Sequence, residues 1–224
     1  MQKPRQQRVH EFASIQGGVL SSFSVHLFTS AYYLLELAHA QGEKEAAEKG
    51  TSNHWSFYAP GSICLLVNGF EVWINESIQS QFFFEADVKK ALAELPLVQR
   101  FYRIPESVNA VMIPENPDLI TLVELRNEIT HFLPRVTTPQ GAIPNWFQDL
   151  EAKGLFITTG KPEGEYTYIQ KLASYWLCYW AWEVVSSAAE AYVDALGTHT
   201  WSEAWTKGNI DAYKALPRPT GIPF

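Results

Sequence analysis

The segment from Tyr168 to about Leu196 constrains the fold most, because it is rich in apolar residues and contains neither proline nor glycine. Trp176 and Trp180 lie four residues apart within it, which is the spacing of one helix face. We therefore expect one long helix that ends at Gly197. The other apolar segments also have helical spacing, so the sequence predicts an all-α fold, a bundle of about five or six helices.

Two helices are expected in the first third of the chain. One runs from Phe23 to His39 and stops near Gly42. The charged sequence after it, QGEKEAAEKGTSN, is expected to be a solvated helix tail or a linker. The other helix begins close to Ser62, whose hydroxyl can cap the amide groups of the first turn, and it continues through Ile78.

The middle of the chain is expected to contain a short helix, an irregular connection and a longer helix. The short helix lies in FEADVKKALAELP and is ended by Pro96. The connection, residues 100–116, contains Pro105, and we expect no regular structure there. The longer helix opens at Pro117 and must end at or before Leu133, because the next residue is a proline that disfavours helical geometry before it.

The 224 residues are expected to form a single domain, with its core in about residues 20–195 and a C-terminal extension in residues 197–224. Within that core, a short helix in PNWFQDLEAKGLFI is expected to end just before Gly154. Residues 160–164 are expected to form a turn. The sequence thus predicts one bundle with one appended segment.

Composition and signals predict a cytoplasmic protein. The first residues, MQKPRQQRVHEF, are basic but no apolar signal core follows, and the run ASYWLCYWAW is about half the length that spans a bilayer. Cys64 and Cys178 stand apart in apolar segments, as buried thiols of a reducing compartment do. The net charge of −7 argues against coating of nucleic acid by bulk electrostatics, so any nucleic-acid contact must be local.

The helix that opens at Pro117 carries an arginine inside its apolar face. At 100° per residue, its leucines and isoleucines fall on one broad side, and Arg126 lies among them. Asn127 and His131 are four residues apart and lie one above the other on the border of that side. A guanidinium in an apolar interface must meet a carboxylate, a phosphate or a partner surface.

The second helix has a similar polar edge, where Glu71 and Asn75 are also four residues apart. If the two helices pack together, these two residues could line one polar seam with Arg126, Asn127 and His131. An ion pair between Arg126 and Glu71, with His131 at the negative end of its helix dipole, would explain the same residues without catalysis.

The sequence LRNEITHFLP resembles the Arg-Asn-x-x-x-His signature of the HEPN superfamily (higher eukaryotes and prokaryotes nucleotide-binding), with Arg126, Asn127 and His131 at the signature positions. The apolar sequence ICLLVNGFEVWINESI is similar to the helix that packs beside this motif. The resemblance implies an α-helical bundle that commonly forms a homodimer. It also implies, in many members, a metal-independent endoribonuclease that acts as a toxin, anti-phage or RNA-processing effector. Some toxin members carry a tyrosine two positions after the histidine, where this chain has Leu133.

The resemblance also implies roles for individual residues, in a cleft that two subunits form together. His131 would be the base or acid that acts on the ribose 2′-hydroxyl, Arg126 would bind the scissile phosphate, and Asn127 would orient either group. Glu71 and Asn75 would support them. No metal or cofactor is expected, and the expected partners are RNA or a nucleotide, a second copy of the chain, and an antitoxin or other partner protein.

Two alternatives belong to other classes. The first is a non-catalytic nucleotide- or protein-binding module of the same fold, whose tryptophans, at 176 and 180 and again at 201 and 205, could form a binding face. The second is a di-iron carboxylate bundle built on two Glu-x-x-His pairs and two further carboxylates. Helical spacing disfavours the di-iron site, because two of the proposed carboxylate ligands project away from the apolar faces of their helices. Its ligands would be Glu36, His39, Glu71, Glu128, His131 and Glu183.

Overall fold

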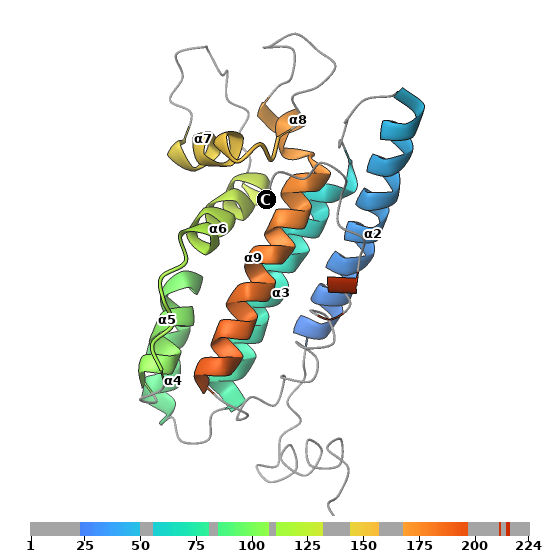
Figure 1. Ribbon diagram of the computed structural model, residues 1–224. Helices are drawn as coiled ribbons and strands as arrows, with labels where there is room; N and C mark the ends of the chain where they lie inside the picture. The colour runs from blue at the N-terminus through green and yellow to red at the C-terminus, as the bar shows by residue number, and fades with distance from the viewer. Residues whose placement is uncertain are drawn as a thin grey trace, which may run out of the picture.

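The computed structural model describes residues 23–49, 56–80, 85–107, 111–131, 144–156, 168–196, 211, 214 and 215. Every regular element in these ranges is a helix, which confirms the all-α prediction (Figure 1). The described ranges contain eight helices, more than the five or six expected. They are α2 (Ser24–Lys49), α3 (Tyr58–Ser80), α4 (Ala86–Ala93), α5 (Leu97–Ser107), α6 (Pro117–Thr130), α7 (Asn145–Ala152), α8 (Tyr168–Leu172) and α9 (Tyr175–Leu196).

Three long helices, α2, α3 and α9, lie side by side, and α4, α5 and α6 form a column along them, with α7 and α8 at one end (Figure 1). Aromatic rings connect the column to the long helices: the ring of Phe101 on α5 stacks on Tyr192 of α9 with centroids 5.7 Å apart. Trp73 of α3 meets Tyr192 edge-on at 5.1 Å. The largest fully buried side chains are Phe70, Trp73, Phe101, Tyr175, Trp182 and Tyr192.

Helices α2 and α3 approach each other closely at Gly69. A Cβ atom there would lie 3.2 Å from the Leu27 Cβ and 3.3 Å from the backbone nitrogen of Phe28, so a larger residue would push the helices apart. Ser62 lies inside α3 and donates a hydrogen bond of 2.7 Å to the backbone oxygen of Ala31. The prediction that Ser62 caps α3 was therefore wrong, because α3 begins one turn earlier.

The first turn of α2 is capped by a residue from another helix. The buried carboxylate of Glu76, on α3, accepts hydrogen bonds from the backbone nitrogens of Phe23 and Ser24 at 2.7 and 3.2 Å. It also accepts one from the Ser24 hydroxyl at 2.6 Å. Helix N-termini present amide groups without helical partners, and a carboxylate is a favourable partner for them. Glu76 therefore fixes where α2 starts.

Helix α2 does not stop near Gly42, as the sequence had suggested, but continues to Lys49. Gly42 lies inside this helix, where a Cβ atom would make an ordinary van der Waals contact of 3.4 Å with the ring of Tyr175 on α9. The charged sequence that begins at Gln41 thus includes the last turns of α2, which is the helix-tail alternative.

The prediction of an irregular connection over residues 100–116 was wrong for its first half. Residues up to Ser107 belong to α5, and Pro105 lies inside this helix near its end. A proline in the last turns removes one backbone donor, yet the apolar face of α5 is broad enough to hold the helix against the core. The buried residues of α5 follow helical spacing: Leu97, Arg100, Phe101, Ile104 and Pro105.

The last predicted helix is broken in two, because Ser174 starts a new helix after α8. Its hydroxyl accepts a hydrogen bond from the backbone nitrogen of Leu177 at 3.4 Å. Other predicted boundaries are confirmed: α6 opens at Pro117 behind an Asn116 cap, and Gly154 follows α7 with a φ of 71°. The predicted turn at 160–164 lies outside the described residues. Within the described ranges, no helix is long and apolar enough to cross a membrane.

Candidate functional site

A single carboxylate, that of Glu71 on α3, binds two arginines from two other helices. Its Oε1 accepts a hydrogen bond from Nη2 of Arg100 at 2.5 Å, and its Oε2 accepts one from Nη2 of Arg126 at 2.9 Å. Asn75 and Asn68, on the same face of α3, accept from the other terminal nitrogens of the two arginines. These five residues, Asn68, Glu71, Asn75, Arg100 and Arg126, are called the Glu71 cluster below.

Arg126 lies on the apolar side of α6, as its position at 100° per residue had predicted. The three fully buried residues of α6 are leucines, and the side chain of Arg126, only 15% exposed, lies beside this apolar face. Its Nη1 donates a hydrogen bond of 3.1 Å to Oδ1 of Asn68. The polar groups that meet the guanidinium are thus supplied by α3, the helix that the sequence had nominated through Glu71.

Arg100 is the member of the cluster that sequence reasoning missed. Its side chain is 8% exposed, the deepest of the three charged members, and it also donates to Oδ1 of Asn75. The signal was present in the sequence, because Arg100 lies three residues after Leu97 and four before Ile104, inside the apolar face of α5. The sequence prediction overlooked this face, because Pro105 suggested an irregular segment.

Asn127 and His131 lie on the surface. Both are exposed, and His131 is the residue that ends α6, with its backbone nitrogen bonded to the Asn127 oxygen at 2.9 Å. Among the described residues, neither side chain forms a hydrogen bond or ion pair with the Glu71 cluster. The proposed polar seam therefore divides into a half-buried cluster and an exposed border that share α6.

Cys64 also lies at the interface of α3 and α6. Its Sγ is 3.8 Å from the Thr130 hydroxyl, one residue before His131. Burial raises the pKa of the Cys64 thiol, while the Thr130 hydroxyl and the charge of Arg126 act in the opposite direction. The thiol is therefore protonated at neutral pH, and Cys64 is a poor candidate for a nucleophile. Cys178 is fully buried, as expected.

Arg100, Arg103, Lys153 and Arg135 are four basic residues that could form a local positive patch, and the three that lie in the described ranges are each paired with a carboxylate. Arg100 is bound within the cluster, and Arg103 forms an ion pair with Glu106 at 3.0 Å. Lys153 forms an ion pair with Asp118. Arg135, the fourth member, lies outside the described residues. Among the three described residues, Arg100 is the one whose charge is held in a buried position, within the Glu71 cluster.

The di-iron alternative finds no support in the geometry of the described ranges. No three His, Cys, Asp or Glu side chains come together there as metal ligands would. Glu36 and Glu183 are both exposed, and Glu71 already binds two guanidinium groups. These carboxylates point to separate surroundings instead of one common centre.

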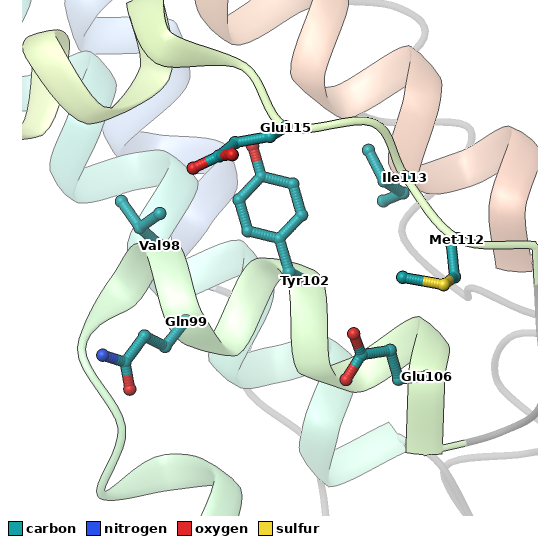
Figure 2. A pocket seen from close by; sticks show the side chains of 7 residues that line it. All are labelled: Val98, Gln99, Tyr102, Glu106, Met112, Ile113 and Glu115. Atoms are coloured by element: carbon teal, nitrogen blue, oxygen red, sulfur yellow. The ribbon is translucent and has the colours of Figure 1, made fainter.

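A hollow of about 360 Å³ lies between α5 and the extended residues 111–116 (Figure 2). Its lining combines apolar side chains, among them Met112 and Ile113, with the carboxylates of Glu106 and Glu115. The Tyr102 hydroxyl accepts a hydrogen bond from the Asn116 backbone nitrogen at 2.7 Å, which ties the extended residues to α5. The described residues that line the hollow include no lysine, arginine or histidine, so their charge does not favour a phosphate.

The Glu71 cluster has chemical properties of its own. It combines two formal positive charges with one negative charge, in a largely dehydrated place where charges interact strongly. The Nε atoms of Arg100 and Arg126 are buried and have no hydrogen-bond partner among the described residues. Such an arrangement can hold a guanidinium rigidly and leaves it able to donate to an anion.

No family model, curated protein or solved structure matches this chain.

Proposed function

We propose that this chain is a metal-independent endoribonuclease with a HEPN-like helical bundle, in which Arg126 binds the scissile phosphate and His131 transfers a proton. The observation that carries the proposal is the fixed position of Arg126 beside an exposed border of the same helix. Glu71 and Asn68 hold the guanidinium at 2.9 and 3.1 Å, and Asn127 and His131 follow on the surface. Preorganised donors of this kind stabilise developing charge without reorganising.

The reaction requires a base, a cation and an acid. His131 takes the proton of the ribose 2′-hydroxyl, and the 2′-oxygen forms a bond to phosphorus. The bond from phosphorus to the 5′-oxygen breaks, and that oxygen takes up a proton. The products carry a 2′,3′-cyclic phosphate and a 5′-hydroxyl. Arg126 stabilises the charge on the phosphoryl oxygens through its planar donors, and Asn127 orients the phosphate or the imidazole.

A second copy of the chain completes this site. One histidine can serve as base or as acid in a given step, and one subunit offers a single His131 beside its Arg126. In a homodimer in which the exposed ends of α6 from the two subunits meet, His131 of the partner subunit supplies the proton that the leaving oxygen needs. We propose cytoplasmic RNA as the substrate, and an antitoxin or partner protein as the component that restrains cleavage.

A second candidate function is a non-catalytic nucleotide- or protein-binding module of the same fold. One observation favours it: both terminal nitrogens of Arg126 already donate to residues of α3. A guanidinium used in this way stabilises the packing of α6, and the exposed Asn127 and His131 then need no catalytic role. The two candidates differ in whether RNA is cut.

The test is cleavage of a mixed RNA pool in EDTA by the wild type and by His131→Ala. His26→Ala is the matched control, because His26 is an exposed histidine on α2, a different helix. We expect the wild type and His26→Ala to leave 2′,3′-cyclic phosphate ends and His131→Ala to lose cleavage, with all three equally folded by circular dichroism. If the wild type does not cut, or if His131→Ala cuts equally well, the ribonuclease proposal is wrong.

A further inference from the structure

We infer that Arg100 is a positioning residue that makes the Glu71 cluster net cationic, so that Arg126 can accept the phosphodiester of single-stranded RNA. This inference rests on the proposed function and adds a residue from outside the motif. It starts from the way in which Glu71 divides its two oxygens between Arg100 and Arg126.

Glu71 alone would weaken an anion site at Arg126. A one-to-one pair of carboxylate and guanidinium has no net charge, and a phosphate that approached Arg126 would also approach an Oε2 only 2.9 Å from its Nη2. Arg100 changes this balance, because it binds the other oxygen of the same carboxylate at 2.5 Å. The cluster then carries one net positive charge, which matches the single negative charge of a phosphodiester.

Arg100 acts through Glu71 and does not contact the ligand itself. Its side chain is 8% exposed, compared with 15% for Arg126 and 28% for Glu71, so the part of the cluster that reaches solvent is the Glu71–Arg126 pair. Asn75 accepts a hydrogen bond from the Nη1 of Arg100 and fixes the buried guanidinium from the other side. The charge of Arg100 is therefore held in place behind the carboxylate.

Arg126 keeps donors for a ligand. A guanidinium has five N–H groups, and the bonds to Glu71 and Asn68 use one on each terminal nitrogen. Three therefore remain, including the one on the buried Nε, which has no acceptor among the described residues. The Nε group is enclosed by protein, so a phosphate oxygen would bind the remaining N–H groups of the two terminal nitrogens.

The alternative is that the cluster only holds α3, α5 and α6 together. The two possibilities predict different signs for two substitutions. Arg100→Gln lowers the net charge of the cluster from one positive charge to zero, whereas Glu71→Gln raises it. Both substitutions remove a partner of the ion pair between Arg100 and Glu71. A purely structural cluster would be damaged by both substitutions, and binding would weaken in both. A charge-controlled anion site would weaken in the first and strengthen in the second.

The experiment measures binding of a fluorescent single-stranded oligoribonucleotide with every 2′-hydroxyl methylated, which prevents cleavage, at several NaCl concentrations. We expect Arg100→Gln to weaken binding by about tenfold, because the phosphodiester loses its attraction to one positive charge at a partly buried site. The slope of log affinity against log salt should fall by about 0.7, the value for one phosphate contact to a single strand. Glu71→Gln should bind as tightly as the wild type or more tightly.

Matched controls change charge outside the cluster. Arg103→Gln lies on the exposed side of α5, and Glu124→Gln lies on the exposed side of α6. Both should change the affinity by no more than about twofold, because exposed charges are screened by salt. Arg100→Lys keeps the charge and loses the forked hydrogen bonds, so it should retain the salt slope of the wild type even if it is less stable.

The outcomes separate this inference from the proposed function. If Glu71→Gln binds as weakly as Arg100→Gln, or if Arg100→Gln binds like the wild type while the wild type still cuts RNA, the inference is wrong and the ribonuclease stands. If the wild type cuts RNA but does not bind the methylated strand, the inference is wrong in the same way. If the wild type neither binds the strand nor cuts RNA, both proposals fail.

Discussion

Helix α3 packs against its neighbours on two sides in two different ways. On the side of α2 the helices approach closely, with Gly69 against the backbone of Phe28 and the Ser62 hydroxyl bonded inside the interface. On the side of α5 and α6 the contact is made by ions and amides around Glu71. The first side has almost no tolerance for added volume, and the second has almost none for a lost charge. The two faces of α3 thus depend on different interactions.

The largest effect is expected in the aromatic core between α3 and α9, from Trp73→Ala. Trp73 is 1% exposed and packs against the rings of Phe70 and Tyr192. Its removal should lower the free energy of unfolding by about 3–5 kcal/mol, because the transfer energy is lost and a cavity is left. Urea unfolding measures this. Tyr33→Ala, on an exposed position of α2, should change stability by less than about 0.5 kcal/mol.

On the charged side, Glu71→Ala should lower the free energy of unfolding by about 3 kcal/mol, because it leaves two buried guanidinium groups without their carboxylate. The control is Glu124→Ala, which removes an exposed carboxylate from α6. Urea unfolding of both variants tests the expectation. A loss equal to that of Glu124→Ala would mean that the cluster contributes nothing to stability, and the contrast between the two faces would disappear.

Alkaline pH should sharpen the comparison, because it titrates buried groups of α9 that lie outside the Glu71 cluster. Burial raises the pKa of Cys178 to about 12 and raises those of Tyr175 and Tyr192 above ordinary tyrosine values. In the unfolded chain a thiol loses its proton near pH 8.5 and a tyrosine near pH 10, so above pH 8.5 the unfolded state binds fewer protons. The free energy of unfolding then falls as pH rises.

This stabilisation is complete below about pH 8.5 and is lost progressively toward pH 12. Cys178 alone should account for about 2 kcal/mol between pH 8 and pH 10. Urea unfolding at pH 8, 9 and 10 measures the loss, and Cys178→Ala should make the pH dependence shallower. An identical pH dependence in the two proteins would show that the thiol does not contribute.

The smallest effects compare two buried tyrosines. The Tyr192 hydroxyl is 2.8 Å from the Ser77 hydroxyl, so Tyr192→Phe should cost about 1 kcal/mol. The Tyr175 hydroxyl is buried without a hydrogen-bond partner among the described residues, so Tyr175→Phe should be neutral or should stabilise by up to about 1 kcal/mol. Thermal unfolding of the two variants side by side tests the contrast, and equal losses would contradict it.

Local signals in the sequence were enough to predict several helix boundaries. Pro117 marks the start of α6, and Gly154 marks the end of α7, because helix starts and turns depend on neighbouring residues. The failures came from residues whose role is set by distant parts of the chain. Gly42 lies inside α2 where that helix packs against a ring of α9, and Ser62 bonds to α2, so neither acts as the local signal that its type suggests.

The candidate site was predictable to a similar extent. The position of Arg126 inside an apolar face required a polar partner, and Glu71 on the neighbouring helix supplies it. Arg100 was missed because the proline near the end of α5 was taken as a sign of irregular structure, although the apolar residues of this segment have helical spacing. That Asn127 and His131 are exposed could not follow from their border position alone, since exposure depends on what packs beside the end of α6.

The cap that Glu76 gives to α2 has a consequence for the order in which the chain assembles. The three bonds of this carboxylate reach back 52 and 53 residues, so the first turn of α2 lacks its acceptor until α3 has docked. A peptide of residues 23–49 alone should therefore fray at its start, and a ribosome must synthesise α3 before α2 can close. Amide hydrogens of that first turn should exchange with solvent at the rate at which the two helices separate, which makes them a reporter for opening of the whole bundle.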